Sequence, residues 1–180
     1  MNIFITGNPG CGKSTLVKKL LGTLHDKKIS GIVTPEIREG GIRQGFKIID
    51  LASGTEEIMA SENIEHGPMV SRYKVNVEGI DRIMDKFLES YEDSDYVVID
   101  EIGSMEFFSE KFKKVMTTVL KSDKPVIATL SKKFVEKYEK AGKVYHLTRD
   151  NFDKVFSELL SLISNQVIRR SDFQKKFYLC

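Results

Sequence analysis

The residues best suited to chemistry form a glycine-rich loop near the start of the sequence. Residues 7–15 match the pattern G-x-x-x-x-G-K-[ST]. Phosphate oxygens need several backbone N–H donors converging from one side, and glycine permits the close approach and the unusual dihedral angles that this requires. We expect Lys13 to place its charge on the β- and γ-phosphates, and the Ser14 hydroxyl to bind Mg²⁺. The nucleotide-binding residues expected here are Gly7, Asn8, Pro9, Gly10, Cys11, Gly12, Lys13, Ser14 and Thr15.

The segments on either side of this loop support the same interpretation. Residues 2–6 are predicted to form a short buried strand, and apolar residues at helical spacing predict a helix from about Lys13. The N-terminus of a helix offers free N–H groups and the positive end of its dipole to an anion. A strand before the loop and a helix after it are the context that a phosphate-binding loop needs.

A second acidic site is predicted where residues 97–99, Val-Val-Ile, are followed by Asp100 and Glu101. An acid at the end of an apolar strand can hold Mg²⁺, usually through water, which is the role expected for Asp100. Glu101 can orient or deprotonate the water that attacks the γ-phosphate, so that Glu101 and Lys13 are the expected catalytic residues. The alternative is a solvent-exposed acidic turn. Asp100, Glu101, Ile102, Gly103 and Thr129 are included among the expected nucleotide-binding residues.

Three further residues are weaker candidates for the same site. Thr129 ends the predicted strand 126–130, where its side chain could contact the γ-phosphate or the attacking water, or simply cap the strand. Arg38 and Arg72 are candidates for a cation that offsets the charge developed in phosphoryl transfer. Either arginine could equally be a surface residue.

The elements that must position these residues alternate along the chain. Strands alternating with helices predict an α/β fold in three layers, with a mostly parallel sheet between helices. Residues 36–38 and 43–51 flank Glu39-Gly40-Gly41 and predict an added antiparallel β-hairpin, because the glycines permit positive φ. Another short strand is predicted over residues 73–77. We expect one domain over residues 1–165, followed by a basic tail over residues 166–180.

The composition fits a globular protein and restricts its partners. Of the 180 residues, 41% are hydrophobic and 30% are charged, and no apolar run is long enough to span a membrane. The net charge is +2, but residues 166–180 hold four basic residues and one acid, so the excess of positive charge lies in this tail. Because the rest of the chain is not basic, we expect no nucleic acid partner. The N-terminus lacks the features of a signal peptide. A cytoplasmic monomer is the default expectation, with two cysteines that form no disulfide framework.

Taken together, these motifs resemble a known family. Residues 7–15, the segment 34–41 with Gly45-Phe46, residues 72–75 and the segment 100–106 occur in the order found in the small P-loop nucleoside-triphosphatases first described from thermophiles, whose relatives include the human cancer-related nucleoside-triphosphatase. The resemblance covers about residues 1–163. It implies a RecA-like core and slow, Mg²⁺-dependent hydrolysis of ATP, GTP, CTP and UTP to diphosphate and phosphate, with broad base specificity. It also implies that residues 148–151 lie near the base.

A nucleoside or nucleotide kinase is a competing interpretation of the same loop. Kinases usually close an arginine-rich lid over the phosphates, whereas residues 102–150 contain Arg149 as their only arginine. The acidic pair at Asp100 and Glu101 also favours water as the acceptor.

A nucleotide-controlled binding module and an AAA+ motor would each use the triphosphate differently. In a binding module, turnover would be incidental and the basic tail, with its aromatic residues, would contact RNA or a partner. An AAA+ motor has a similar glycine-rich loop but needs a helical second domain, for which this chain is too short.

Overall fold

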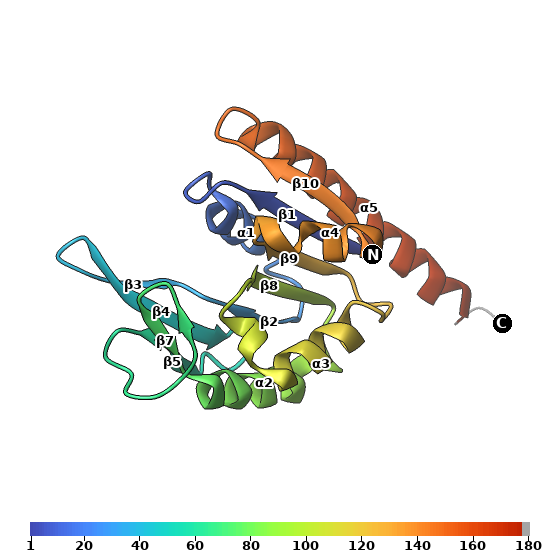
Figure 1. Ribbon diagram of the computed structural model, residues 1–180. Helices are drawn as coiled ribbons and strands as arrows, with labels where there is room; N and C mark the ends of the chain where they lie inside the picture. The colour runs from blue at the N-terminus through green and yellow to red at the C-terminus, as the bar shows by residue number, and fades with distance from the viewer. Residues whose placement is uncertain (178–180) are drawn as a thin grey trace.

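The computed structural model describes residues 1–177, with side chains described as far as Ser164, and shows a ten-stranded sheet with helices on both faces (Figure 1). The strands are β1 (Asn2–Gly7), β2 (Ile29–Val33), β3 (Glu36–Glu39), β4 (Ile42–Asp50), β5 (Glu56–Ser61), β6 (Met69–Val70), β7 (Tyr73–Val75), β8 (Tyr96–Ile102), β9 (Val126–Leu130) and β10 (Lys143–Leu147). The α-helices are α1 (Lys13–Leu21), α2 (Val77–Tyr91), α3 (Glu110–Val119), α4 (Val135–Tyr138) and α5 (Phe152–Phe177). Short 3₁₀ turns are η1 (Glu106–Phe108), η2 (Lys132–Phe134) and η3 (Glu139–Ala141).

The sheet has a parallel half and an antiparallel half. Its strand order is β10-β1-β9-β8-β2-β4-β5-β7-β6, with β3 paired to β4 off this path. Strands β10, β1, β9, β8 and β2 pair in parallel, and the pairs from β2–β4 outward are antiparallel. The predicted α/β architecture is therefore confirmed, including the antiparallel addition.

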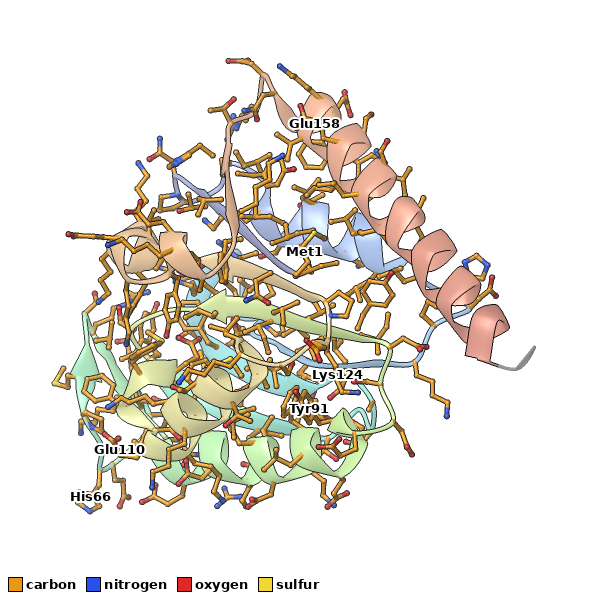
Figure 2. All side chains as sticks on the ribbon, turned by 90° about the vertical axis from the view of Figure 1, so that its right-hand side faces the viewer. Met1, His66, Tyr91, Glu110, Lys124 and Glu158 are labelled. Atoms are coloured by element: carbon orange, nitrogen blue, oxygen red, sulfur yellow. The ribbon has the colours of Figure 1, made fainter. Side chains whose placement is uncertain are left out.

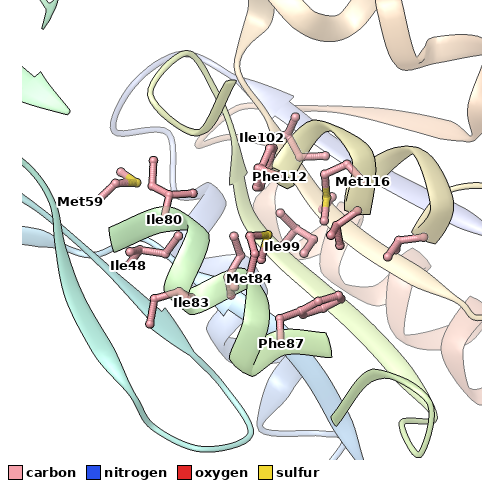
Figure 3. Close-up of a cluster of buried hydrophobic side chains, with 14 of the residues drawn as sticks. Ile48, Met59, Ile80, Ile83, Met84, Phe87, Ile99, Ile102, Phe112 and Met116 are labelled. Atoms are coloured by element: carbon pink, nitrogen blue, oxygen red, sulfur yellow. The ribbon is translucent and has the colours of Figure 1, made fainter. Parts of the chain in front are cut away.

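Alternate residues of the central strands fill two separate cores, because successive side chains in a strand point to opposite faces. In β1, Phe4 joins the core under α2 and α3, whereas Ile3 and Ile5 join the core under α1 and α5. Figure 3 shows the first of these cores, where Ile83 and Phe87 of α2 are fully buried. Burial of such a side chain contributes roughly 1.5–3 kcal/mol, so both faces of the sheet are held by apolar packing.

The amino-terminal ends of β8 and β9 are joined by a lysine. The Nζ atom of Lys124 donates hydrogen bonds to the carbonyl oxygens of Glu92 and Ser94, at 2.7 and 2.8 Å, and lies 5.3 Å from the centre of the Tyr91 ring (Figure 2). This contact connects the end of α2 to the loop before β9, at the end of the sheet away from the glycine-rich loop.

The predicted hairpin is present and is larger than the sequence indicated. Strands β3 and β4 flank Gly40 and Gly41, whose φ angles of 56° and 82° fit the predicted tight turn. Strand β5 was not predicted, because its first residues, Glu56 and Glu57, are acids and only Met59, Ala60 and Ser61 at its end are buried. The prediction that the strand near residue 73 continues to Val77 was wrong, since Asn76 caps α2 by accepting a hydrogen bond from the Gly79 N–H.

Two details near the C-terminal end also differ from expectation. Residues 133–141 form η2, α4 and η3 in place of one helix. Asp150 is not the N-cap of α5, because the carbonyl of Asn151 accepts the first helical hydrogen bond, from Val155. Helix α5 runs through the expected boundary between residues 165 and 166 without interruption. The side chains of the predicted basic tail, and residues 178–180 altogether, lie outside the described part of the chain.

Among the described residues, no helix is both long enough and apolar enough to cross a membrane.

Candidate active site

The glycine-rich loop connects the end of β1 to the start of α1, as expected. Gly12 stands directly before α1 with a φ of 104°, a left-handed conformation that L side chains rarely adopt. A Cβ atom on Gly12 would also lie 3.3 Å from the Phe152 ring, so the loop packs closely against the first turn of α5. This backbone path leaves the first N–H groups of α1 without partners in their own helix, as every helix N-terminus does.

The predicted residues of the loop divide into exposed and buried positions. Cys11 is buried beneath the loop, and its amide donates to the carbonyl of Asn8 at 3.2 Å, which closes the turn. The side chain of Lys13 folds back over the loop and its Nζ donates to the Gly7 carbonyl at 3.3 Å. The exposed positions are Asn8, Pro9, Gly10, Ser14 and Thr15. The exposed residues of the loop can therefore contact a ligand, while the buried Cys11 packs beneath the loop.

Asp100 lies at the carboxyl end of β8, on the same edge of the sheet as the glycine-rich loop, with only β9 between β8 and β1. Its side chain is buried, and the Thr129 hydroxyl donates to its Oδ1 at 2.7 Å. Its backbone carbonyl accepts hydrogen bonds from the N–H and the hydroxyl of Thr34, at 2.6 and 2.7 Å. Neighbouring strands on both sides therefore hold Asp100 in place.

Thr129 is fully buried, and its described partner is the Asp100 carboxylate. The structure thus links the Thr129 side chain to a neighbouring acid. A role for Thr129 through Asp100 fits this geometry better than the direct contact with the γ-phosphate that the sequence suggested.

Glu101 is only partly exposed and follows Asp100 through a cis peptide bond. Burial raises the pKa of its carboxyl group above the ordinary value, the positive charge of Lys13 acts in the opposite direction, and the Asp100 carboxylate raises the pKa further. Lys13 and Glu101 are therefore within electrostatic reach of each other. This brings together the two residues that the sequence identified as catalytic.

The two residues after Glu101 differ in what they can offer a nucleotide. The Ile102 side chain is fully buried in the core under α2 and α3, and its carbonyl accepts a hydrogen bond from the Ser131 N–H. A nucleotide contact from the Ile102 side chain is therefore excluded. Gly103 has no side chain, and the space beside it is bounded by the carboxyl groups of Glu101 and Glu106.

Glu106 is a residue of this region whose importance the sequence did not reveal. It is only 3% exposed, and its burial raises the pKa of its carboxyl group to about 8. The available signal was its place as the last residue of segment 100–106, one of the segments that carry the family resemblance, although no role in the site was predicted for it. An acid in such a segment usually faces solvent, so burial could be seen only in the structure.

The two candidate arginines lie in the antiparallel part of the sheet, where each has partners. Arg38 binds Glu36 and donates to the Gly41 carbonyl at 2.8 Å. Arg72 forms an ion pair with Glu62 at 2.9 Å and donates to the Tyr73 hydroxyl. Both guanidinium groups are about half exposed, so either could reach a ligand only by exchanging partners.

The donor set fits Mg²⁺ better than a transition metal. Within residues 1–164, no group of three histidine, cysteine, aspartate or glutamate side chains is placed to hold a metal ion. Mg²⁺ is usually held by one or two protein oxygens together with water and substrate phosphates. The hydroxyl of Ser14 and the carboxylate of Asp100, both at the carboxyl edge of the sheet, are oxygen donors of this kind.

Comparisons with known proteins agree with this geometry. The sequence pattern of the family described as "NTPase" matches residues 2–160. The nucleoside-triphosphatase THEP1 of Methanocaldococcus jannaschii is 43% identical over 167 residues, covering 91% of this chain and 97% of the relative. The protein of the same name from Pyrococcus abyssi is 41% identical over 176 residues, covering 96% of this chain and 97% of the relative.

Solved structures show the same similarity. The crystal structure of THEP1 from the hyperthermophile Aquifex aeolicus superposes with a TM-score of 0.76 at 32% identity, covering 90% of this chain and 98% of that chain. The solution structure of a human cancer-related nucleoside triphosphatase gives a TM-score of 0.74 at 26% identity, covering 91% and 97%. The chain therefore belongs to the THEP1 family of P-loop nucleoside-triphosphatases, and it is an enzyme that hydrolyses nucleoside triphosphates.

Proposed function

We propose that this enzyme hydrolyses ATP, GTP, CTP and UTP slowly to diphosphate and phosphate, with Mg²⁺ as its cofactor and with broad base specificity. The observation that carries the proposal is the placement of Glu101 one residue after Asp100, on the edge of the sheet that also carries Lys13, with Lys13 and Glu101 acting on each other electrostatically. This arrangement places a carboxylate that can accept a proton from water near a cation that can bind the phosphates.

In the proposed reaction, residues 7–15 hold the triphosphate through backbone N–H groups, and Lys13 offsets the negative charge of the β- and γ-phosphates. Glu101 accepts a proton from a water molecule as the water oxygen bonds to the γ-phosphorus. The bond from that phosphorus to the β,γ-bridging oxygen breaks, and the diphosphate leaves with the electron pair. When bound, Mg²⁺ would supply charge neutralisation of the phosphates, and Ser14 and Asp100 would hold it.

Broad base specificity follows from which part of the substrate the loop holds. Residues 7–15 recognise the triphosphate, which all four substrates share. We propose that the base lies near residues 148–151, a loop close to the phosphate site because a Cβ atom on Gly12 would lie only 3.3 Å from the ring of the following residue, Phe152. The amide of Thr148 donates to Oδ1 of Asn151, and the amide of Asn151 donates to the Thr148 hydroxyl, so the loop is held rigid.

For the arginines, we propose only that one of the two acts in the transition state. Arg38 or Arg72 would stabilise the transition state after exchanging its present acidic partner for the γ-phosphate. Unchanged turnover in both Arg38→Ala and Arg72→Ala would remove this part of the proposal.

The location, oligomeric state and division of the chain are proposals of the same kind. We infer a cytoplasmic monomer that has no nucleic acid partner, with residues 1–165 as the catalytic domain and residues 166–180 as a basic tail. Light scattering of the full chain with and without nucleotide would test the oligomeric state.

The overall proposal is tested by measuring phosphate release from ATP, GTP, CTP and UTP, with and without Mg²⁺, for the wild type and Lys13→Ala. We expect release from all four nucleotides, dependence on Mg²⁺ and loss of activity in Lys13→Ala. Release from one nucleotide alone would refute broad specificity, and full activity in the presence of a chelator would refute the role of Mg²⁺.

A further inference from the structure

Glu106, the first residue of η1, carries a carboxyl group that is almost completely buried. Burying a carboxyl group is costly unless hydrogen bonds compensate for the lost water. Here Oε2 of Glu106 lies against Gly103, and the backbone of Gly103 and of Glu106 itself opposes part of the rise in the pKa of this carboxyl group. The carboxyl group therefore folds back onto the segment directly following Glu101.

Gly103 shows how close this carboxyl group comes to Glu101. A Cβ atom built on Gly103 would lie 2.9 Å from Oε2 of Glu106 and 3.2 Å from Oε1 of Glu101. Both carboxyl groups thus border one small space, which is open because residue 103 has no side chain. Any change in the path of Gly103 would alter the room available to Glu101.

The turn containing Glu106 is closed by bonds that do not involve its side chain. The amide of Phe108 donates to the Met105 carbonyl and the amide of Ser109 donates to the Glu106 carbonyl, at 3.2 and 3.1 Å. On the other side of Gly103, Ile102 is anchored in the core. Gly103 lies between these two fixed points, with the Glu106 carboxyl group packed against it.

We propose that Glu106 is a positioning residue for the hydrolytic reaction, holding the amide of Gly103 so that the neighbouring Glu101 carboxylate keeps the direction needed to accept a proton from water. The inference rests on the proposed role of Glu101 as the base. Glu106 acts through its shape and its acceptor oxygen, and contacts neither the phosphates nor the attacking water.

This role makes a conservative variant informative. Burial raises the pKa of Glu106 to about 8, so its carboxyl group is mostly neutral at pH 7. Glutamine has nearly the same shape, is also neutral and retains an oxygen that can accept the Gly103 N–H. Glu106→Gln should therefore restore what Glu106→Ala loses.

The experiment compares single-turnover hydrolysis of ATP and ATP affinity in Glu106→Ala, Glu106→Gln and the wild type. We expect Glu106→Ala to lower the hydrolysis rate by roughly ten- to hundredfold, the effect of a displacement of about 1 Å in a catalytic group. ATP affinity should stay within about threefold, since the phosphate loop is untouched, and Glu106→Gln should recover most of the rate. Glu110→Ala is the matched control, because it removes an exposed acid, labelled in Figure 2, whose ion pair is with Lys113.

Two results would overturn the proposal. One is a wild-type rate in Glu106→Ala. The other is a Glu106→Gln rate as low as that of Glu106→Ala, which would assign the effect to acidity and not to the acceptor oxygen. If Glu106→Ala fails to fold, Gly103→Ala tests the proposal in its place. The added methyl group enters the space between the two carboxyl groups and should slow hydrolysis with ATP affinity unchanged. A wild-type hydrolysis rate in Gly103→Ala would refute the positioning role.

Glu101→Gln, measured in parallel, separates this inference from the proposed function. Slow hydrolysis in Glu101→Gln together with a wild-type rate in Glu106→Ala refutes the positioning role alone. Full activity in Glu101→Gln refutes the proposed base, and the positioning role with it.

Discussion

The Thr129 hydroxyl donates a 2.7 Å hydrogen bond to Oδ1 of Asp100, and the threonine side chain is fully buried. The bond joins the carboxyl ends of β9 and β8 and restrains the carboxylate proposed to hold Mg²⁺. Partners of metal ligands orient those ligands, and their loss typically costs ten- to hundredfold in metal affinity or activity.

Thr129→Val should therefore raise the Mg²⁺ concentration needed for half-maximal phosphate release by roughly tenfold or more. Valine has nearly the same shape as threonine but cannot donate a hydrogen bond to Asp100. The measurement is a Mg²⁺ titration of phosphate release, with Thr129→Ser as the control that keeps the hydroxyl. An unchanged Mg²⁺ requirement in Thr129→Val would show that the bond only supports the fold.

Lys13→Ala should abolish detectable nucleotide binding, because it removes the cation that lies over the loop against the Gly7 carbonyl. Equilibrium binding of a fluorescent ATP analogue measures this loss. Lys18→Ala, which removes an exposed lysine from the same helix, is the control and should bind normally. If the two variants bind ATP equally well, Lys13 is not a phosphate ligand.

The pH dependence of hydrolysis should reflect the raised pKa of Glu101. Its carboxyl group must be ionised to accept a proton, and burial raises its pKa above 4.5. The rate of single-turnover hydrolysis should therefore decrease as pH falls, with a midpoint above that of an ordinary glutamate. The residual rate of Glu101→Gln should lack this decrease, and a similar decrease in that variant would assign it to another group.

Glu106 should make the protein less stable as pH rises from about 5 to 8. Its pKa is about 8 in the folded protein and about 4.5 when unfolded, so the folded state binds the proton more tightly. The stabilisation is complete below pH 4.5 and is lost as pH rises through 8, at up to about 1.4 kcal/mol per pH unit. Urea unfolding at pH 5 and pH 8 should show a smaller decrease in the free energy of unfolding for Glu106→Gln. An equal decrease in both proteins would rule out this titration.

The sequence was sufficient for the parts of the molecule that depend on local patterns. The apolar stripe of α1 and the short apolar run of β1 predict the core, and the spacing of residues 7–15 predicts a loop between these two elements that the structure confirms. Asp100 could be placed beside the loop because the carboxyl ends of parallel strands share one edge of the sheet.

Sequence patterns could not predict the contacts between elements that are far apart in the chain. The pairing of Thr129 with Asp100 depends on the register of β8 against β9, and the burial of Glu106 depends on how η1 folds back over Gly103. Strand β5 escaped prediction because one face carries Glu56 and Ile58 outward while Met59 and Ala60 pack inside. In each case a distant element decides the environment of the residue.

Glu101 is proposed to activate water that attacks a nucleotide held by Lys13. The most direct measurement is single-turnover hydrolysis of ATP by Glu101→Gln, with ATP affinity determined on the same preparation. We expect wild-type affinity and a hydrolysis rate lower by roughly a hundredfold or more, since the amide cannot accept the proton. Wild-type affinity combined with a wild-type rate would contradict this role of Glu101.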